Sequence, residues 1–340
     1  MSPTELEDGW ERVSAEAPTG PGCYYRRLPS EGSWPAHVAV TLPSSLRALI
    51  LEADRRELRH HRFAEETRGF KIDVIPDEFG RPDRASLRIA ENAGAVRDIF
   101  SVFCADIATH WLAAHGIGAA LQDLEKRLQK WKRFFQRGRD EGLSREDYVG
   151  VFGELTFFQH CLDAGIDAIR LVGAWNGPAS ANQDFAFGPV AVEVKTGTGN
   201  NPRIVHISNV RQLDGTGLAK LFLCHHVFDF REGSGATLLD LVSHLRRQLE
   251  NTSPTAAAAF EDKLIEAGFV EAQIGEFAQW GFTERPGGSI FDVANGFPRL
   301  LENIVPHGIG AVTYDLDLAT ASAFVCRAED VWEEVAQRHG

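Results

Sequence analysis

The sequence predicts an α/β fold in which helices flank a mixed central sheet. Three observations predict it. An almost wholly apolar helix is expected from Ser144, a favourable N-cap, to just before Gly165. Residues 190–196 alternate between apolar and other side chains, which is typical of a strand. Further apolar strand patterns cover 203–208 and 220–230, and one helix followed by several strands is typical of an α/β core.

The first 115 residues are predicted to form an α+β unit. Residues 1–35 contain Gly, Pro, Ser and Trp without periodicity, so we expect an irregular arm there. A small antiparallel sheet should follow, because short apolar runs are separated by turn residues. The predicted strands are residues 37–42, 48–52, 70–75 and 86–90. A helix is predicted from Ala95 to Ala113, with Asn92 as its cap, because apolar residues recur at spacings of three and four.

The remaining elements complete a division into three parts. Ala168 to Ala174 is an apolar run that is predicted as a strand, and a short helix is expected to begin near Asn209. The predicted elements beyond residue 232 are helices at 237–249, 254–268 and 331–338 and strands at 282–293 and 310–316. The expected parts are an N-terminal α+β domain (1–115), a core domain (116–232) and a C-terminal α/β extension that packs on the core (233–340).

Composition limits the class of protein. The chain has 340 residues, of which 44% are hydrophobic and 24% charged, as is ordinary for a soluble globular protein. No apolar run approaches the ~20 residues that span a bilayer, and the acidic N-terminus lacks a signal-peptide pattern, so we expect a cytoplasmic protein without membrane contact. The five cysteines are far apart and are interpreted as reduced thiols without zinc-binding spacing. The net charge of −13 opposes tight non-specific binding to nucleic acid.

A tight hairpin is predicted to carry most of the chemistry. Its turn is at Gly188-Pro189, and its second strand presents three valines to one face and Glu193 and Lys195 to the other. Asp184 precedes the turn and comes close to Glu193 if the two strands pair. Two carboxylates and a lysine at one sheet edge can hold a hard divalent cation with oxygen ligands. The alternative is a solvated face with a weak ion pair.

A further carboxylate of interest lies in the apolar helix. Glu154 lies there beside Gly153 and one turn after Gly150. A buried carboxylate is costly unless it is paired or bound to a cation, and each glycine costs about 1 kcal/mol relative to alanine. We therefore expect the helix backbone to approach another element closely near Glu154. The alternative is a glutamate at the rim of the helix that reaches water.

A basic amphipathic helix is predicted over residues 118–136. The stretch from Leu124 to Arg139 carries seven basic residues against one acidic residue, Glu125. In so acidic a chain this local excess is a candidate phosphate-facing surface, and a solvated helix face is an equal alternative. The residues proposed to contact nucleic acid are Lys126, Arg127, Lys130, Lys132 and Arg133.

These patterns resemble those of the PD-(D/E)XK nuclease superfamily, which has the restriction-endonuclease-like fold. The matching phrases are Gly150-Val-Phe-Gly-Glu-Leu, Gln183-Asp-Phe, Glu193-Val-Lys-Thr, Ile207-Ser-Asn, Gln212-Leu and Gly296-Phe-Pro-Arg-Leu. They are similar to an uncharacterised bacterial PD-(D/E)XK family that is associated with phage-defence and restriction-like gene clusters. The resemblance is strongest over residues 144–214, where Gln183 stands in the place of the motif's proline.

The resemblance implies an endodeoxyribonuclease that depends on Mg²⁺ or Mn²⁺. Asp184 and Glu193 would ligate the metal together with the carbonyl oxygen of Val194. Lys195 would orient or deprotonate the attacking water and stabilise charge on the phosphate. Glu154 would hold a water on the metal or a second ion.

The resemblance also implies that Gln212 positions the backbone near the scissile phosphate. The expected partners are DNA and other subunits of a defence system, such as an ATPase, a helicase or a methyltransferase. Because the chain is acidic and has no ATPase motif, a motor or DNA-reading partner is expected to deliver the substrate. Two alternatives stay open: a catalytically silent nuclease-fold subunit that binds nucleic acid or scaffolds a complex, and an unrelated α/β enzyme with a structural Glu-Lys pair.

Overall fold

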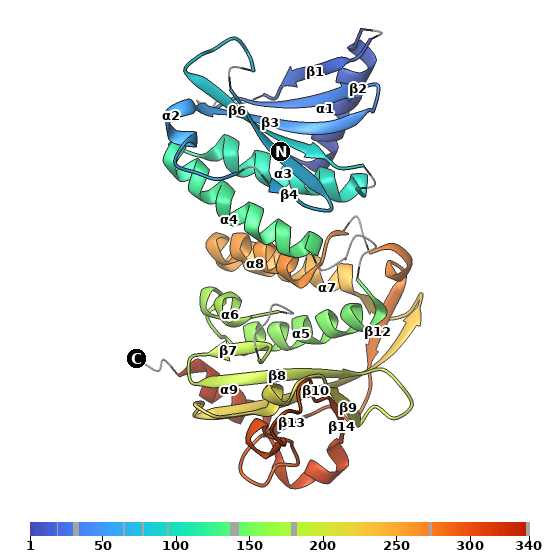
Figure 1. Cartoon of the computed structure of the whole chain (residues 1–340). Coiled ribbons are helices and arrows are strands. Elements are labelled where there is room, and N and C mark those ends of the chain that lie inside the picture. The colour runs from blue at the N-terminus through green and yellow to red at the C-terminus, as the bar shows by residue number, and fades with distance from the viewer. Residues whose placement is uncertain are drawn as a thin grey trace. The chain divides into compact units, whose positions relative to one another are not determined.

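The computed structural model divides the chain into two compact units, Met1–Gly142 and Leu143–Gly340 (Figure 1). The described residues are 1–18, 20–29, 34–63, 65–76, 78–93, 95–136, 143–177, 182–271 and 274–337. None of the helices in these ranges is both long enough and apolar enough to cross a membrane.

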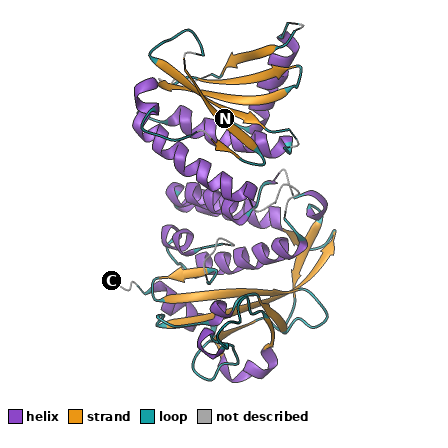
Figure 2. Cartoon of the chain, viewed as in Figure 1, coloured by secondary structure: helices purple, strands orange, loops and turns teal. Residues whose placement is uncertain are grey.

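The first unit is built on an antiparallel sheet with the strand order β1-β2-β3-β6-β5-β4. Its strands are β1 (Gly22–Arg27), β2 (Ala36–Leu42), β3 (Leu46–Asp54), β4 (Glu65–Glu66), β5 (Phe70–Pro76) and β6 (Arg84–Glu91). Its helices are α1 (Pro3–Glu16), α2 (Arg55–Leu58), α3 (Arg97–Ala113) and α4 (Ile117–Gln136). Helices α1 and α3 pack on each other and on β2, so they cover one face of the sheet (Figure 2).

Two expectations for this unit are wrong. Residues 1–35 do not form an irregular arm, because Ser2 and Glu5 make a capping box that begins α1, and β1 follows. The Trp10 indole is buried and donates a hydrogen bond of 2.9 Å to the carbonyl oxygen of Ala48. Asn92 does not cap α3, whose N-cap is Val96.

The basic helix α4 belongs to this first unit. Trp131 and Phe135 of α4 pack on Phe103 of α3, with ring centroids 5.3 and 6.0 Å from that ring. The boundary between the two units in the sequence therefore lies after residue 142, whereas the sequence patterns placed a boundary after residue 115. The basic residues Arg137 and Arg139 lie outside the described residues.

The second unit has a mixed seven-stranded sheet, which confirms the predicted α/β class. Strand β10 is its centre, because it pairs in parallel with β8 and antiparallel with β12 and β13. The strands of this unit are β7 (Phe185–Phe187), β8 (Val190–Gly197), β9 (Ile204–Ile207), β10 (Lys220–Glu232), β11 (Ala236–Thr237), β12 (Trp280–Glu284), β13 (Ser289–Asp292), β14 (Tyr314–Asp317) and β15 (Val325–Cys326). Strands β9 and β14 form a separate two-stranded sheet.

Helices lie on the sheet of the second unit. They are α5 (Arg145–Asp163), α6 (Ala168–Ala174), α7 (Leu238–Thr252), α8 (Pro254–Ala267) and α9 (Ala328–Ala336), with 3-10 turns η2 (Val210–Leu213), η4 (Gly275–Phe277), η5 (Glu302–Ile304) and η6 (Leu318–Phe324). One core contains side chains of α5 to α9 and the valines of β8, and a second core on the other face contains Ala191 and Leu223. Because the predicted C-terminal extension contributes side chains to both hydrophobic cores, residues 233–340 share one unit with residues 143–232 of the predicted core domain.

Two element predictions in this unit are wrong. The segment 168–174 is a helix rather than a strand, because the Asp167 carboxylate caps it by accepting a hydrogen bond of 2.9 Å from the Arg170 N–H. A short apolar run fits a buried strand and a buried helix equally well. The predicted strand 282–293 is two strands, β12 and β13, separated by a turn in which Gly287 has a φ of 118°.

Candidate functional site

The predicted hairpin places Asp184 beside Glu193. Strands β7 and β8 pair antiparallel with Phe185 opposite Val192, so Asp184 is the next position along, opposite Glu193. The turn between the strands contains Gly188 with a φ of 73°, a conformation that glycine adopts without strain. The short sequence spacing between the two carboxylates is therefore accommodated by a tight hairpin.

The end of β7 exposes one edge of β8. Beyond Phe185 the partner strand stops, and the N–H of Val194 donates a hydrogen bond of 2.7 Å to Asp184 Oδ2 instead. Because the N–H and C=O of one strand residue point to the same edge, the Val194 carbonyl also faces this edge. The two carboxylates and the carbonyl expected to ligate a metal are thus grouped at one place on β8.

Glu193 and Lys195 form a buried ion pair. They are two positions apart on β8 and so share a face, and Lys195 Nζ lies 2.8 Å from Glu193 Oε1. Glu193 is only 1% exposed, which excludes the alternative of a solvated face. Glu193 Oε2 has no hydrogen-bond partner among the described residues. A buried carboxylate oxygen without a donor is costly, which favours a cation at this position.

Gln212 holds Lys195 from the other side. Its Oε1 accepts a hydrogen bond of 3.1 Å from Lys195 Nζ and one of 3.0 Å from the Ser208 N–H. The 3-10 turn η2 carries Gln212, and Gln183 Nε2 donates to the carbonyl oxygen of Arg211 in the same turn at 2.8 Å. Gln212 therefore contacts the lysine of the site directly.

Glu154 approaches the hairpin from α5. It is 8% exposed, and Oε2 accepts a hydrogen bond of 2.7 Å from the Trp175 indole, so the alternative of a glutamate at the rim of the helix is wrong. The expected close approach occurs at Gly153, where an added Cβ would lie 1.8 Å from Thr196 Oγ1. Only glycine lets α5 lie this close to β8, and this closeness brings Glu154 near the other carboxylates.

Burial raises the pKa of all three carboxyl groups, and the charge of Asp184 raises the pKa of the other two further. Burial and the charge of Asp184 raise the pKa of Glu154 well above its ordinary value. Burial raises the pKa of Asp184 to about 6, although the nearby Lys195 ammonium opposes this. Burial and the Asp184 charge raise the pKa of Glu193 to about 8. The three groups are not all ionised at neutral pH unless a cation offsets their charge.

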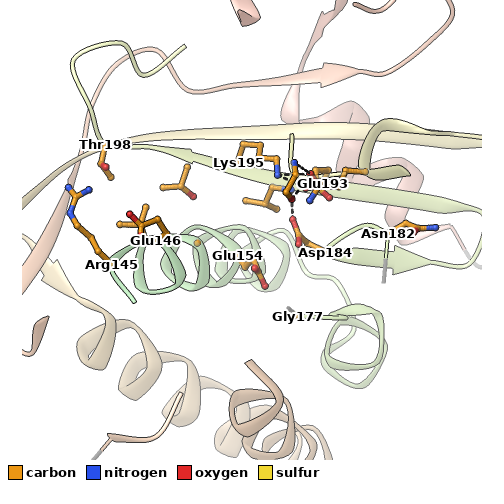
Figure 3. A pocket seen from close by; sticks show the side chains of 15 residues that line it. Arg145, Glu146, Glu154, Gly177, Asn182, Asp184, Glu193, Lys195 and Thr198 are labelled. Atoms are coloured by element: carbon orange, nitrogen blue, oxygen red, sulfur yellow. Dashed lines mark hydrogen bonds and ion pairs between the residues drawn. The ribbon is translucent and has the colours of Figure 1, made fainter. Parts of the chain in front are cut away.

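These side chains line a cavity of about 490 Å³ (Figure 3). Helix α5 and strand β8 provide most of its wall. The residues that line it are Arg145, Glu146, Val149, Gly150, Glu154, Gly177, Asn182, Asp184, Glu193, Val194, Lys195, Thr196, Thr198, Ser208 and Gln212. Asp184 and Glu193 lie near one end of the cavity in Figure 3, and Arg145 and Thr198 lie near the other.

The residues of the site fit a hard divalent cation held by few protein ligands. Among the described residues, no group of three or more His, Cys, Asp or Glu side chains is placed to hold a metal ion. An ion here would be bound by the Asp184 and Glu193 carboxylates and the Val194 carbonyl, in an open site. Mg²⁺ is commonly held by one or two carboxylates and keeps the rest of its shell for water and substrate phosphate.

The basic residues of α4 contribute less surface than expected. Arg127 and Lys130 are 8% and 7% exposed, and Arg127 forms ion pairs with Asp106 and Asp123 at 2.5 and 3.0 Å. Their burial counts against contact with a phosphate backbone. Lys132 forms an ion pair with Glu65. Of the five proposed residues, Lys126 and Arg133 are exposed, and their contact with nucleic acid stays a prediction.

Several residues of the cavity were not found by sequence reasoning. Arg145, Thr198 and Ser208 line it, and Trp175, which is not one of the lining residues, donates a hydrogen bond to Glu154. Helical periodicity carried no signal for Arg145, because it lies nine residues before Glu154 on α5 and positions nine residues apart lie on opposite faces of a helix. The other three residues also have no local signal.

Comparison with known proteins identifies the family. The model of the family described as "Putative PD-(D/E)XK family member, (DUF4420)" matches residues 6–319. No curated protein and no solved structure matches the chain. Because the family model covers most of both units, and the carboxylates and lysine of its motif meet at one cavity, the chain belongs to this PD-(D/E)XK family.

Proposed function

We propose that this protein is a metal-dependent nuclease that hydrolyses phosphodiester bonds of DNA. One observation carries the proposal: Asp184, Glu193, Lys195 and Glu154 line a single cavity in which a buried carboxylate oxygen of Glu193 has no hydrogen-bond donor among the described residues. Three acidic groups with raised pKa values beside one lysine form a site that attracts a cation and, with it, an anionic substrate.

Each side chain has a role in this reaction. Asp184 and Glu193 would hold Mg²⁺ or Mn²⁺ together with the Val194 carbonyl, and Glu154 would lie behind them, fixed by Trp175. The bound ion supplies Lewis acidity toward the phosphate and makes water a better nucleophile. Hydrolysis adds a water oxygen to phosphorus as the bond to the leaving sugar oxygen breaks.

Lys195 acts on the charge that grows during this step. Its ammonium group is held between Glu193 and Gln212, at 2.8 and 3.1 Å, so its position is fixed before substrate binds. A fixed donor beside a phosphate oxygen stabilises the transition state without reorganisation. Lys195 also orients the attacking water in this proposal.

We further propose that the nuclease acts within a multi-protein anti-phage or restriction-like system. The support is the resemblance of the motifs to a family linked with such systems and the net charge of −13, which disfavours tight DNA binding by the chain alone. A partner with ATPase, helicase or methyltransferase activity would deliver the DNA. Tight binding of DNA by the purified protein at physiological salt would contradict this requirement.

Cleavage of plasmid DNA and labelled oligonucleotides with Mg²⁺ or Mn²⁺ tests the nuclease proposal. Wild type should cut, and Asp184→Ala and Lys195→Ala should not. Glu193→Gln should also be inactive, whereas Glu232→Gln, at an exposed position of β10, should cut like wild type. Circular dichroism melting of each variant excludes misfolding as the cause.

The rival is a catalytically silent nuclease-fold subunit. The observation that favours this rival is that, among the described residues, no group of three or more His, Cys, Asp or Glu side chains is placed to hold a metal ion. An inert wild type, with every metal and with partner proteins present, would select this rival. A crystal soaked with Mn²⁺ gives an independent readout, because anomalous density between Asp184 and Glu193 is expected whether or not the protein cuts.

A further inference from the structure

We propose that the cavity holds a second phosphate of the same nucleic-acid strand, in a subsite formed by Arg145 and Thr198 at the end away from Asp184 and Glu193. Gly150 lies between the two ends and lacks a side chain so that the strand can pass. This inference rests on the proposed nuclease function and adds the residues that position its substrate.

The length of the cavity exceeds what one phosphate needs. Arg145 and Glu154 both line it from α5, and their positions, nine residues apart in the sequence, are separated by roughly 13 Å along the helix axis. A strand of B-form DNA advances about 3.4 Å per nucleotide along its axis. A strand whose scissile phosphate lies beside Lys195 therefore places another of its phosphates within reach of Arg145.

Arg145 has the properties of a phosphate ligand. It is exposed, and among the described residues it forms no ion pair with a carboxylate. Its guanidinium carbon lies 5.3 Å from the centre of the Phe230 ring, and this contact fixes the side chain while leaving its N–H groups free to donate. An arginine with unused donors matches two oxygens of a phosphate.

The other wall of the subsite offers a hydroxyl group. Thr198, the residue after β8, lines the cavity, and Figure 3 shows Arg145 and Thr198 at the same end. Hydroxyl donors and arginine together are common partners of nucleic-acid phosphates. Arg145 and Lys195 are the two cationic side chains among the described residues that line the cavity, and the Glu146 carboxylate also lines it beside Arg145 (Figure 3).

Packing against neighbouring atoms does not explain why position 150 of α5 is a glycine. A Cβ at Gly150 would meet no atom within 4 Å, whereas a Cβ at Gly153 would clash with Thr196. Glycine inside a helix costs about 1 kcal/mol relative to alanine, so stability alone would favour a larger residue at position 150. Its space opens into the cavity that it lines. We assign this space to the substrate strand.

Binding of a fluorescent 12-nucleotide strand, measured by anisotropy in Ca²⁺ over a range of salt concentrations, tests Arg145. Arg145→Ala should weaken binding about 10-fold and reduce the salt slope by about one, because one phosphate contact is lost. Arg145→Lys should recover part of the affinity. Arg247→Ala, at an exposed position of α7 outside the cavity, is the control and should bind like wild type.

Substitution of Gly150 by a larger residue tests whether the substrate strand occupies the space beside it. Gly150→Leu should weaken strand binding at least 10-fold, while Gly173→Leu, in α6, should not change it, since a Cβ at Gly173 also meets no atom within 4 Å. Melting curves of both variants show that they fold. Affinity for Mn²⁺ should be unchanged in Arg145→Ala and Gly150→Leu, because neither residue holds the ion.

The outcomes separate this inference from the proposed function. If Arg145→Ala and Gly150→Leu bind the strand with wild-type affinity and salt slope, the second subsite is wrong even though wild type cuts DNA. If wild type binds but never cuts, the nuclease function fails, and the affinities of these two variants still decide whether the subsite exists. If wild type does not bind the strand at all, the subsite is overturned.

Discussion

The N–H of Val194 donates a hydrogen bond of 2.7 Å to the carboxylate of Asp184, ten residues earlier in the chain. This bond replaces the ladder bond that β8 loses where β7 ends, so one carboxylate completes the hairpin and also belongs to the candidate metal site. The bond engages Oδ2, which leaves Oδ1 as the oxygen that can serve a cation. Structure and chemistry at position 184 can therefore be separated by substitution.

We expect Asp184→Asn and Asp184→Ala to differ in stability but not in activity. The amide oxygen of Asn can still accept from the Val194 N–H, so its free energy of unfolding should equal or exceed that of wild type without metal. Asp184→Ala leaves this N–H unpaired and should lose about 1–3 kcal/mol. Both should lose Mn²⁺ binding. Urea denaturation and calorimetric titration measure the two effects, and equal stability of both variants would contradict the role of the hydrogen bond.

Gln212 is expected to act by positioning Lys195. Gln212→Ala removes the acceptor of the Lys195 ammonium and of the Ser208 N–H, so we expect kcat to fall by roughly 10 to 100-fold, as for other groups that orient a catalytic side chain. KM and Mn²⁺ affinity should change little. Steady-state kinetics with an oligonucleotide substrate gives the split. A rise in KM at constant kcat would indicate instead that Gln212 binds the substrate.

Metal binding should strengthen as the pH rises from 6 to 8. The pKa of Glu193 is raised from its ordinary 4.5 to about 8 and that of Asp184 to about 6, so metal-free protein carries protons that a cation must displace. A carboxyl group with a raised pKa in the folded state stabilises the fold fully below its ordinary value, and this stabilisation is lost as the pH rises toward the folded value. Metal-free protein should therefore melt at a lower temperature at pH 8 than at pH 6.

The control for this pH dependence is Glu193→Gln. Glutamine carries no proton that titrates and buries no charge, so the metal-free variant should melt at a higher temperature than wild type at pH 8 and should show a smaller change between pH 6 and 8. Thermal melts with and without Mn²⁺, and calorimetry in buffers of different ionisation enthalpy, report the shift and the released protons. Identical melting profiles for wild type and variant would mean that Glu193 is ionised in both states.

Local signals predicted the central parts of the site. The alternation of 190–196, the Gly188 turn and the apolar helix that contains Glu154 each depend on residues near one another in sequence, and the structure has all three. The close approach of the helix backbone near Glu154 was also predictable, because a glycine inside a buried helix lowers stability relative to alanine and therefore indicates a site where a side chain would not fit. Periodicity and turn chemistry are local properties, so they survive folding.

The parts that failed depend on tertiary contacts. Nothing in the sequence near Trp175 indicates that its indole binds Glu154, since these residues are brought together by packing of α5 and α6. The positive charge of α4 suggested a surface that binds phosphate. However, Arg127 forms an ion pair with Asp106 of α3, and the composition of the sequence does not reveal this partner. The segment 168–174 was assigned to a strand because its helix is too short for periodicity to show.

The contrast between two glycines of α5 gives a last prediction. Gly153→Ala would bring a Cβ to 1.8 Å from Thr196 Oγ1, so α5 and β8 must move apart or Thr196 must change rotamer. We expect a loss of about 1–3 kcal/mol in the free energy of unfolding, together with a loss of cleavage because Glu154 moves away from the hairpin. Gly150→Ala meets no atom and should instead gain up to about 1 kcal/mol.

Thr196→Ala provides the second half of this test. Removing Oγ1 should restore at least half of the stability that Gly153→Ala loses, because the closest contact disappears and the next atom, Thr196 Cβ, lies 3.2 Å from the added methyl carbon. Urea denaturation of the two single variants and the double variant gives the coupling energy between the two positions. Additive losses would show that the contact between Gly153 and Thr196 does not set how closely α5 packs on β8.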